Sequence, residues 1–116
     1  MQPNIIFLVI DSIRSDKFFS MDTSKKPTID NLIQNGIYFS QAITSADATI
    51  LSWSSLYTGK YPFNTGIRSS RFNKLDDNIL TMFNLLEKSG YFLYSFTPTF
   101  SETIGLFPKF KNENNF

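Results

Sequence analysis

The hydroxyl-rich stretch SADATILSWSSLYTGKYP, residues 45–62, holds the side chains best suited to chemistry. Thr49 begins a predicted helix, where its hydroxyl would lie beside unpaired backbone N–H groups and the positive end of the helix dipole. That position favours binding of a substrate anion. Ser52 falls one helical turn after Thr49, whereas Ser54 and Ser55 fit a polar helix face. Thr49 also fits the ordinary role of an N-cap residue, which requires no substrate.

Asp11 is the second candidate, because it directly follows the apolar run NIIFLVI at residues 4–10. A carboxylate at the end of a strand can bind a hard cation such as Mg²⁺, Ca²⁺ or Mn²⁺, since these ions prefer fixed oxygen ligands. The structural alternative for Asp11 is a turn or cap residue. The sequence contains neither His nor Cys, so imidazole bases and thiolate nucleophiles are excluded.

Composition narrows the class of protein further. The 116 residues carry a formal net charge of +1, and their charged side chains are scattered along the chain, which argues against nucleic-acid binding. Residues 4–10 are too few to span a bilayer, and no basic residue precedes them as in a signal peptide. We therefore expect a cytoplasmic protein with no membrane segment.

The apolar pattern predicts an α/β fold formed by a single unit over residues 1–116. Strands are expected at residues 4–10, 37–43 and 91–97. Helices are expected from Pro27 to Gly36, from Thr49 to Gly59, and from a cap at Asp77 to Gly90. This alternation favours a mostly parallel sheet with helices on both faces. Because ligands bind at the carboxyl ends of such strands, Asp11 and Thr49 should meet at one sheet edge.

Four segments, in this order, resemble the N-terminal part of the sulfatase family within the alkaline phosphatase superfamily. They are PNIIFLVIDSIRSD, PTIDNLIQNGIYFSQAI, TILSWSSLYTGKYPFNTG and LLEKSGY, and together they cover about residues 3–97. The resemblance implies the N-terminal portion of an alkaline-phosphatase-like fold.

The resemblance also implies roles for the two candidates. Asp11 matches the aspartate that binds metal after the first strand, while Ser12 replaces a second aspartate. Thr49 lies nine residues before Thr58 of the Thr-Gly pair, which is the position of the nucleophile and a metal ligand. Sulfatases proper have there a Cys or Ser that is oxidised to formylglycine, and threonine cannot form that aldehyde. Thr49 instead resembles the nucleophile of family members in which a metal-activated alkoxide attacks phosphorus.

Other positions match the family pattern unevenly. Ser52 matches the motif serine and Lys60 a frequent basic residue after Thr-Gly, so both are candidate substrate-binding residues. Trp53 stands where relatives often have a cation that binds the anion. Arg14 and Asp16 match an R-x-D pattern, which we interpret as local structural support.

The predicted function is metal-dependent hydrolysis of a small sulfate or phosphate ester, with Ca, Mn, Zn or Mg as the cofactor. In full-length relatives the remaining metal ligands follow well beyond residue 116, so we expect a partial domain that is inactive alone and self-associates through an exposed sheet edge. One alternative is a protein like the phosphoglycerol or phosphoethanolamine transferases. Another is a non-catalytic remnant that binds an anion or a partner protein.

Overall fold

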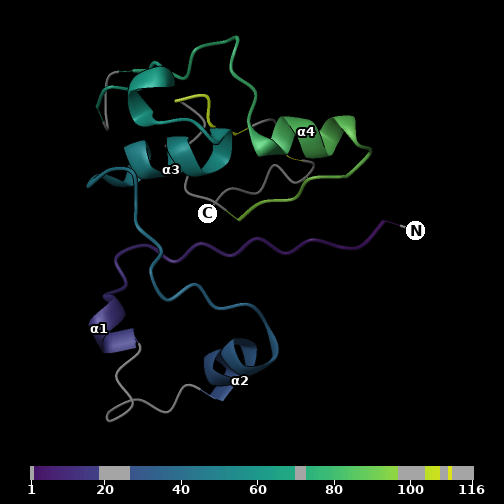
Figure 1. Ribbon diagram of the computed structural model, residues 1–116. Coiled ribbons are helices and arrows are strands. Elements are labelled where there is room, and N and C mark those ends of the chain that lie inside the picture. Colours follow the sequence, from purple (N-terminus) through teal and green to yellow (C-terminus); the bar gives the residue numbers. More distant parts are fainter. Residues whose placement is uncertain (1, 19–26, 70–72, 97–103, 108–109, 111–116) are drawn as a thin grey trace. The chain divides into compact units, whose positions relative to one another are not determined.

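The computed structural model describes residues 2–18, 27–69, 73–96, 104–107 and 110 (Figure 1). Its helices are α1 (Ser15–Phe18), α2 (Pro27–Asn35), α3 (Thr49–Thr58), the 3-10 helix η1 (Pro62–Asn64) and α4 (Met82–Lys88). The chain divides into two compact units, Met1–Ala42 and Ile43–Phe116. We call them unit 1 and unit 2 and describe each by itself. None of the described helices has the length and apolar character needed to cross a bilayer.

Helix α2 of unit 1 has the boundaries that the sequence predicts. Pro27 is its first residue, where a fixed φ and a missing N–H suit the first turn. Gly36 follows its last residue, Asn35, whose side-chain amide donates to the carbonyl of Asn31 at 3.0 Å. Ile29 is half-buried, as expected for an apolar position of this short helix.

The apolar run of residues 4–10 is extended, but the described part of the chain contains no assigned strand (Figure 1). Its side chains are exposed, from 37% for Val9 to 94% for Ile6. The expected burial is therefore not found. A parallel strand becomes buried only when neighbouring strands and covering helices pack on it. Ile37, Phe92 and Phe96 in the other two predicted strands are exposed as well. The mostly parallel sheet stays a prediction, and residue 97 lies outside the described residues.

Unit 2 forms its core around helix α3. Ala48 precedes the helix in an extended conformation, and Gly59 ends it with a φ of 66°, in the left-handed region that glycine adopts easily. Among the residues that the structure describes, the buried apolar side chains are Ile50, Tyr57, Ile67, Leu75, Ile104 and Leu106. Two of these core residues lie in loops that are joined by a backbone hydrogen bond: the Leu75 amide donates to the Ile104 carbonyl at 2.9 Å.

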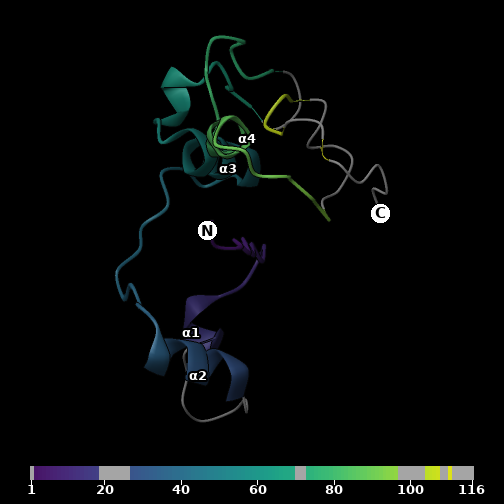
Figure 2. The ribbon, with the colours of Figure 1, turned by 90° about the vertical axis from the view of Figure 1, so that its right-hand side faces the viewer.

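Helix α4 lies beside α3, as Figures 1 and 2 both show. The ring of Phe83 on α4 contacts that of Tyr57 on α3, with 5.0 Å between the ring centroids. Phe107 packs on both rings, at 5.3 Å from each. Burial raises the pKa of Tyr57 to about 12, so its phenol stays neutral within this aromatic cluster at physiological pH.

The predicted start of α4, with Asp77 as its cap, is wrong. The helix begins at Met82, and Thr81 caps it: Thr81 Oγ1 accepts from the Asn84 amide at 3.4 Å, and Asn84 Oδ1 accepts from the Thr81 amide at 2.8 Å. This reciprocal pair is a capping box. Asp77 instead pairs with Lys74 at 3.0 Å, because the residues after Asp76 form a turn in which Asp76 Oδ1 accepts the Asn78 amide.

Ser55 of α3 leads to a prediction about stability. Its hydroxyl oxygen is buried and has no hydrogen-bond partner among the described residues. We expect Ser55→Ala to raise the free energy of unfolding by about 1 kcal/mol, because it removes an unsatisfied hydroxyl and improves helix propensity. Urea denaturation measures the change. Ser54→Ala is the matched control, because the Ser54 hydroxyl donates to the Leu51 carbonyl at 2.7 Å. An equal gain in both variants would contradict the argument.

Candidate functional site

Thr49 is the first residue of α3, and the N-cap position belongs to Ala48. The N-cap alternative for Thr49 is therefore wrong. Alanine has no side-chain oxygen, and no side-chain hydrogen bond from the described residues caps this helix at Ala48. The first backbone N–H groups of a helix lack partners within it and carry the positive end of its dipole. The Thr49 hydroxyl thus belongs to a helix end that suits a substrate anion.

Ser52, one turn along α3, is held by a residue that the sequence did not single out. Its hydroxyl lies 2.8 Å from the Thr44 hydroxyl. Thr44 Oγ1 also bonds the Ala46 carbonyl at 2.9 Å, where it is the donor, so Ser52 donates in the pair. The hydrogen bond ties the loop before α3 to the helix. Thr44 and Ser52 are eight positions apart in the sequence, and the only sequence signal for their hydrogen bond was that both carry hydroxyls.

Asp11 of unit 1 stands directly after the extended run and is exposed. Its Oδ1 accepts the Ser12 amide at 2.9 Å, and Ser12 has a φ of 61°, an uncommon value for a residue other than glycine. The turn role predicted as an alternative is therefore present. Thr49 belongs to unit 2, so the expected meeting of Asp11 and Thr49 stays a prediction.

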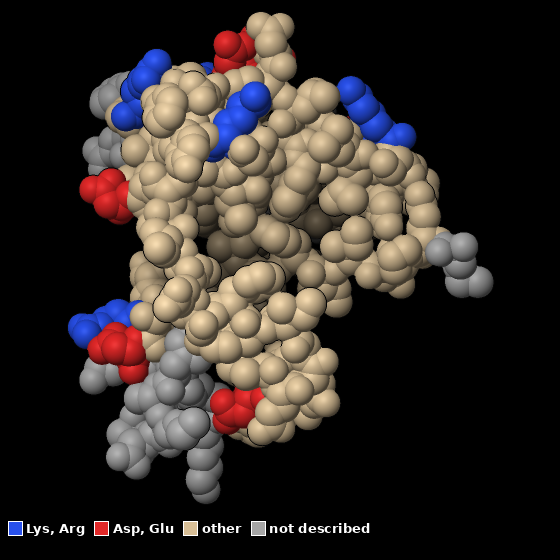
Figure 3. Space-filling model, in the orientation of Figure 1, with Lys and Arg blue, Asp and Glu red and all other residues tan. Residues whose placement is uncertain are grey.

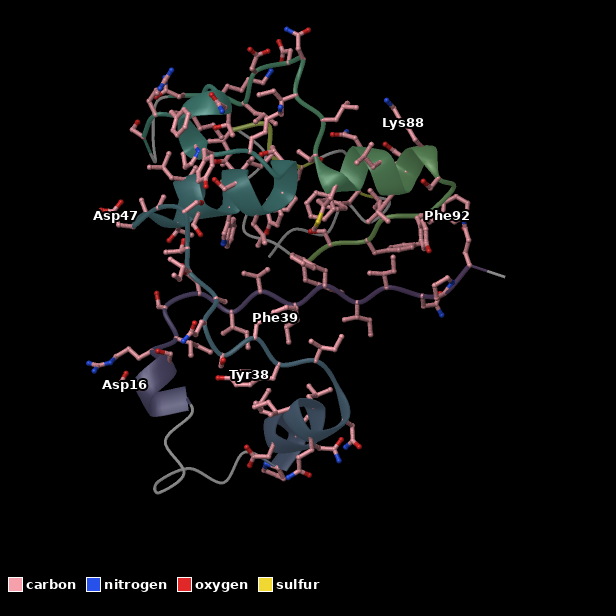
Figure 4. All side chains as sticks on the ribbon, in the orientation of Figure 1. Asp16, Tyr38, Phe39, Asp47, Lys88 and Phe92 are labelled. Atoms are coloured by element: carbon pink, nitrogen blue, oxygen red, sulfur yellow. The ribbon has the colours of Figure 1, made fainter. Side chains whose placement is uncertain are left out.

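Arg14 and Asp16 form the local contact that the sequence predicted. The guanidinium donates twice to the carboxylate, with Nε to Oδ1 at 2.9 Å and Nη2 to Oδ2 at 2.7 Å. This hydrogen bonding raises the pKa of Arg14 above its ordinary value. Both side chains are largely exposed, and Asp16 lies on α1 (Figure 4). The pair joins Arg14 to the first turn of α1, just after Asp11 in the sequence.

Two further positions of the family motif are Trp53, which packs among aromatic rings, and Lys60, which is exposed. Trp53 packs toward Tyr57 and Phe107, with ring centroids 6.1 and 6.4 Å apart, so this position contributes to the aromatic cluster. Lys60 is exposed just beyond α3, and its backbone amide donates to Thr58 Oγ1 at 3.2 Å. A substrate-binding role for Lys60 stays a prediction.

The oxygen donors of Asp11 and Thr49 suit a hard divalent cation. The described residues contain no group of three or more His, Cys, Asp or Glu side chains that could hold a metal. Asp47, which the sequence reasoning left out, is a carboxylate on the loop leading into α3 (Figure 4). Figure 3 shows that the described residues present both basic and acidic side chains at their surface.

Comparisons with known proteins identify the family of the chain. The family model named Sulfatase matches residues 3–114. The chain is 30% identical over 92 residues to an ulvan-active sulfatase of Formosa agariphila, covering 78% of this chain and 18% of the relative. It is 30% identical over 96 residues to an N-acetylgalactosamine-6-O-sulfatase of Bacteroides thetaiotaomicron, covering 78% and 19%. No solved structure matches the chain significantly.

The chain spans about a fifth of the length of these curated relatives. Membership in their family implies an alkaline-phosphatase-like fold, although the described residues contain no strand. The family match begins before Asp11, includes Thr49 and continues beyond α4. On this match over nearly its whole length, the chain belongs to the sulfatase family.

Proposed function

We propose that this chain supplies the nucleophile and two metal ligands of a metal-dependent hydrolase of sulfate or phosphate esters. Thr49 is the nucleophile, and Asp11 and Thr49 bind the metal. The observation that carries the proposal is the place of Thr49 as the first residue of α3, directly after an alanine N-cap. Membership in the sulfatase family supports ester hydrolysis. The remaining metal ligands come from a segment outside residues 1–116.

The chemistry follows from the residues at the start of α3. Thr49 Oγ1 forms a bond to phosphorus or sulfur as the bond to the ester oxygen breaks, and that oxygen leaves as an alcohol with the proton lost from Thr49. Water then adds to the transferred group, which departs as phosphate or sulfate, and the Thr49 hydroxyl is restored. A divalent cation supplies positive charge that favours loss of the hydroxyl proton. Backbone N–H groups of the first turn stabilise the negative charge on the transferred group. The hydrogen bond between the Ser52 and Thr44 hydroxyls holds the loop before α3 against the helix.

Threonine at position 49 determines which chemistry we propose. Formylglycine cannot form from threonine, so direct attack by the Thr49 oxygen replaces attack by an aldehyde hydrate. This supports phosphate esters as substrates beside sulfate esters. One relative is named an N-acetylgalactosamine-6-O-sulfatase, so sulfated sugars are the first sulfate esters to test on this chain.

A second candidate function is binding of a partner polypeptide without catalysis. It is favoured by the apolar run of residues 4–10, where Ile6 is 94% and Leu8 75% exposed. Contiguous exposed apolar surface marks interaction sites in many soluble proteins. The two candidates differ in metal binding, which the catalytic proposal requires and the second does not.

Titration with Mn²⁺ tests the proposed metal site. The paramagnetic ion broadens the NMR signals of nearby amides, even when binding is weak. We expect the amide signals of Asp11 and Thr49 to broaden together at low Mn²⁺, because both residues contribute ligands to one ion. Asp11→Asn should abolish the broadening at both positions.

Asp30→Asn is the matched control, because Asp30 is also an exposed carboxylate of unit 1. This variant should leave the broadening at Asp11 and Thr49 unchanged. Broadening that is scattered over the surface carboxylates and indifferent to Asp11 would reject the proposed metal site. Broadening at Asp11 alone would separate the two residues and leave Thr49 without its proposed metal.

A further inference from the structure

Asn35 and Gly36 form the only Asn-Gly pair in the sequence, and they stand at the end of helix α2. Both residues are exposed to solvent. Because glycine has no β-carbon, no side chain hinders the approach of its amide nitrogen to the side chain of the preceding residue. The pair therefore has the atoms and the access for a reaction between the Gly36 nitrogen and the Asn35 side-chain carbonyl carbon.

The end of α2 keeps glycine at position 36. A β-carbon built on Gly36 would lie 2.8 Å from the carbonyl oxygen of Leu32, closer than real β-carbons approach other atoms. This oxygen belongs to the helix backbone, so it cannot turn aside as the end of a side chain would. The Asn-Gly pair is thus tied to the way in which the helix ends.

The amide of Gly36 differs from the amides that follow three other asparagines, which are Asn64, Asn78 and Asn84. Each of those amides donates to a backbone carbonyl, at 3.0, 2.9 and 3.3 Å; the donors are Thr65, Ile79 and Leu85. Within the described ranges, no such hydrogen bond is found for the Gly36 amide. Its nitrogen is therefore the most available of the four for attack on the preceding side chain.

Helix α2 can open at this end, as the reaction requires. None of the residues of α2 is buried, so little packing opposes fraying of its last turn. The Asn35 side-chain nitrogen donates to the Asn31 carbonyl at 3.0 Å, and this bond must break before Cγ of Asn35 reaches the Gly36 nitrogen. Breaking an exposed hydrogen bond costs little, because water replaces the lost partner.

We propose that Asn35 is a site of spontaneous deamidation. The Gly36 nitrogen loses its proton and forms a bond to Cγ of Asn35, while the bond from Cγ to Nδ2 breaks and that nitrogen leaves with the proton as ammonia. The product is a cyclic imide. Water then adds to one of its two carbonyl carbons and opens the ring, which leaves aspartate or isoaspartate at position 35. The reaction consumes water and releases ammonia.

The modification places a negative charge at the end of α2. One neutral amide becomes one carboxylate, so the formal net charge of +1 falls by one unit to zero. The carboxylate lies at the negative end of the helix dipole and cannot donate to the Asn31 carbonyl. Asn35→Asp reproduces this charge without the imide. It should speed hydrogen exchange of the last-turn amides of α2 about two- to fivefold.

The test is incubation of the full chain in heavy-oxygen water at neutral pH, followed by digestion and mass spectrometry. The peptide that contains Asn35 should lose ammonia and take up oxygen from the solvent, and fragmentation should locate both aspartate and isoaspartate at position 35. Conversion there should be at least about tenfold faster than at Asn64, Asn78 or Asn84. Asn35→Gln should suppress it, because the longer side chain must close a larger ring.

Leu85→Gly is the matched control, because it creates a second Asn-Gly pair at a position that is 54% exposed in α4. The amide at position 85 donates to the Thr81 carbonyl, and the Asn84 side chain belongs to the capping box. Asn84 should therefore convert more slowly than Asn35 in this variant. The proposal is overturned if Asn35 persists while other asparagines convert, if Asn35→Gln releases ammonia equally fast from position 35, or if Asn84 in Leu85→Gly converts as fast as Asn35.

Discussion

Ester turnover is expected to fall at least about 10³-fold when Thr49 is replaced by alanine, because the attacking oxygen is lost with the side chain. The measurement is release of phenol from phenyl phosphate and phenyl sulfate with Mn²⁺, Zn²⁺, Ca²⁺ or Mg²⁺. The sample is this chain co-expressed with the part of the Formosa agariphila relative outside the matched region, because this chain spans 18% of that relative. That part is added to provide the metal ligands that the proposal places outside residues 1–116.

Thr58→Ala is the control for the loss of a threonine hydroxyl from α3. Thr58 is at the opposite end of the helix from Thr49, and its hydroxyl donates to the Ser54 carbonyl at 2.6 Å. This variant should keep its turnover. If turnover is the same with threonine and alanine at position 49, Thr49 is not the nucleophile, even where the ester is hydrolysed in a metal-dependent way.

Ile67→Ala is expected to lower the free energy of unfolding of unit 2 by about 2–5 kcal/mol. Ile67 is 1% exposed and lies in a core to which the described residues contribute six buried apolar side chains, so truncation leaves a cavity. Small domains have a total stability of about 5–15 kcal/mol. One truncation therefore removes a large share of it. Urea denaturation followed by far-UV circular dichroism measures the change.

Ile43→Ala is the same chemical change at an exposed position of unit 2, where Ile43 is 91% exposed. Its effect should stay within about 0.5 kcal/mol. Equal denaturation midpoints for the two variants would mean that the packing around Ile67 contributes nothing to folding.

The sequence predicted the helices best where local signals agree. Pro27 and Gly36 bound α2, and Thr49 and Gly59 bound α3. Proline favours the first turn of α2, and Gly59 ends α3 in the left-handed conformation, with a φ of 66°. At α4 the local signals competed. Asp77 and Thr81 both suit an N-cap, and the turn at residues 76–78 left Thr81 to cap the helix.

The extended segments show why other features could not be read from sequence. Whether residues 4–10 become a buried strand depends on neighbours distant in sequence, which a local apolar pattern does not identify. At the candidate site, too, contacts between near neighbours in the sequence were easier to predict than contacts that depend on the fold. The Arg14–Asp16 pair joins near neighbours in the sequence and was predicted, whereas the Thr44–Ser52 hydrogen bond depends on how the loop before α3 folds.

Trp53 is the sole tryptophan of the chain, so its packing against Tyr57 and Phe107 has a spectroscopic consequence. Intrinsic fluorescence excited at the indole reports on unit 2 alone, and unit 1 contributes none of that emission. Trp53 also follows Thr49 by four residues, which places both on the same side of α3. An anion that binds at Thr49 should therefore change the indole emission without any added dye or label.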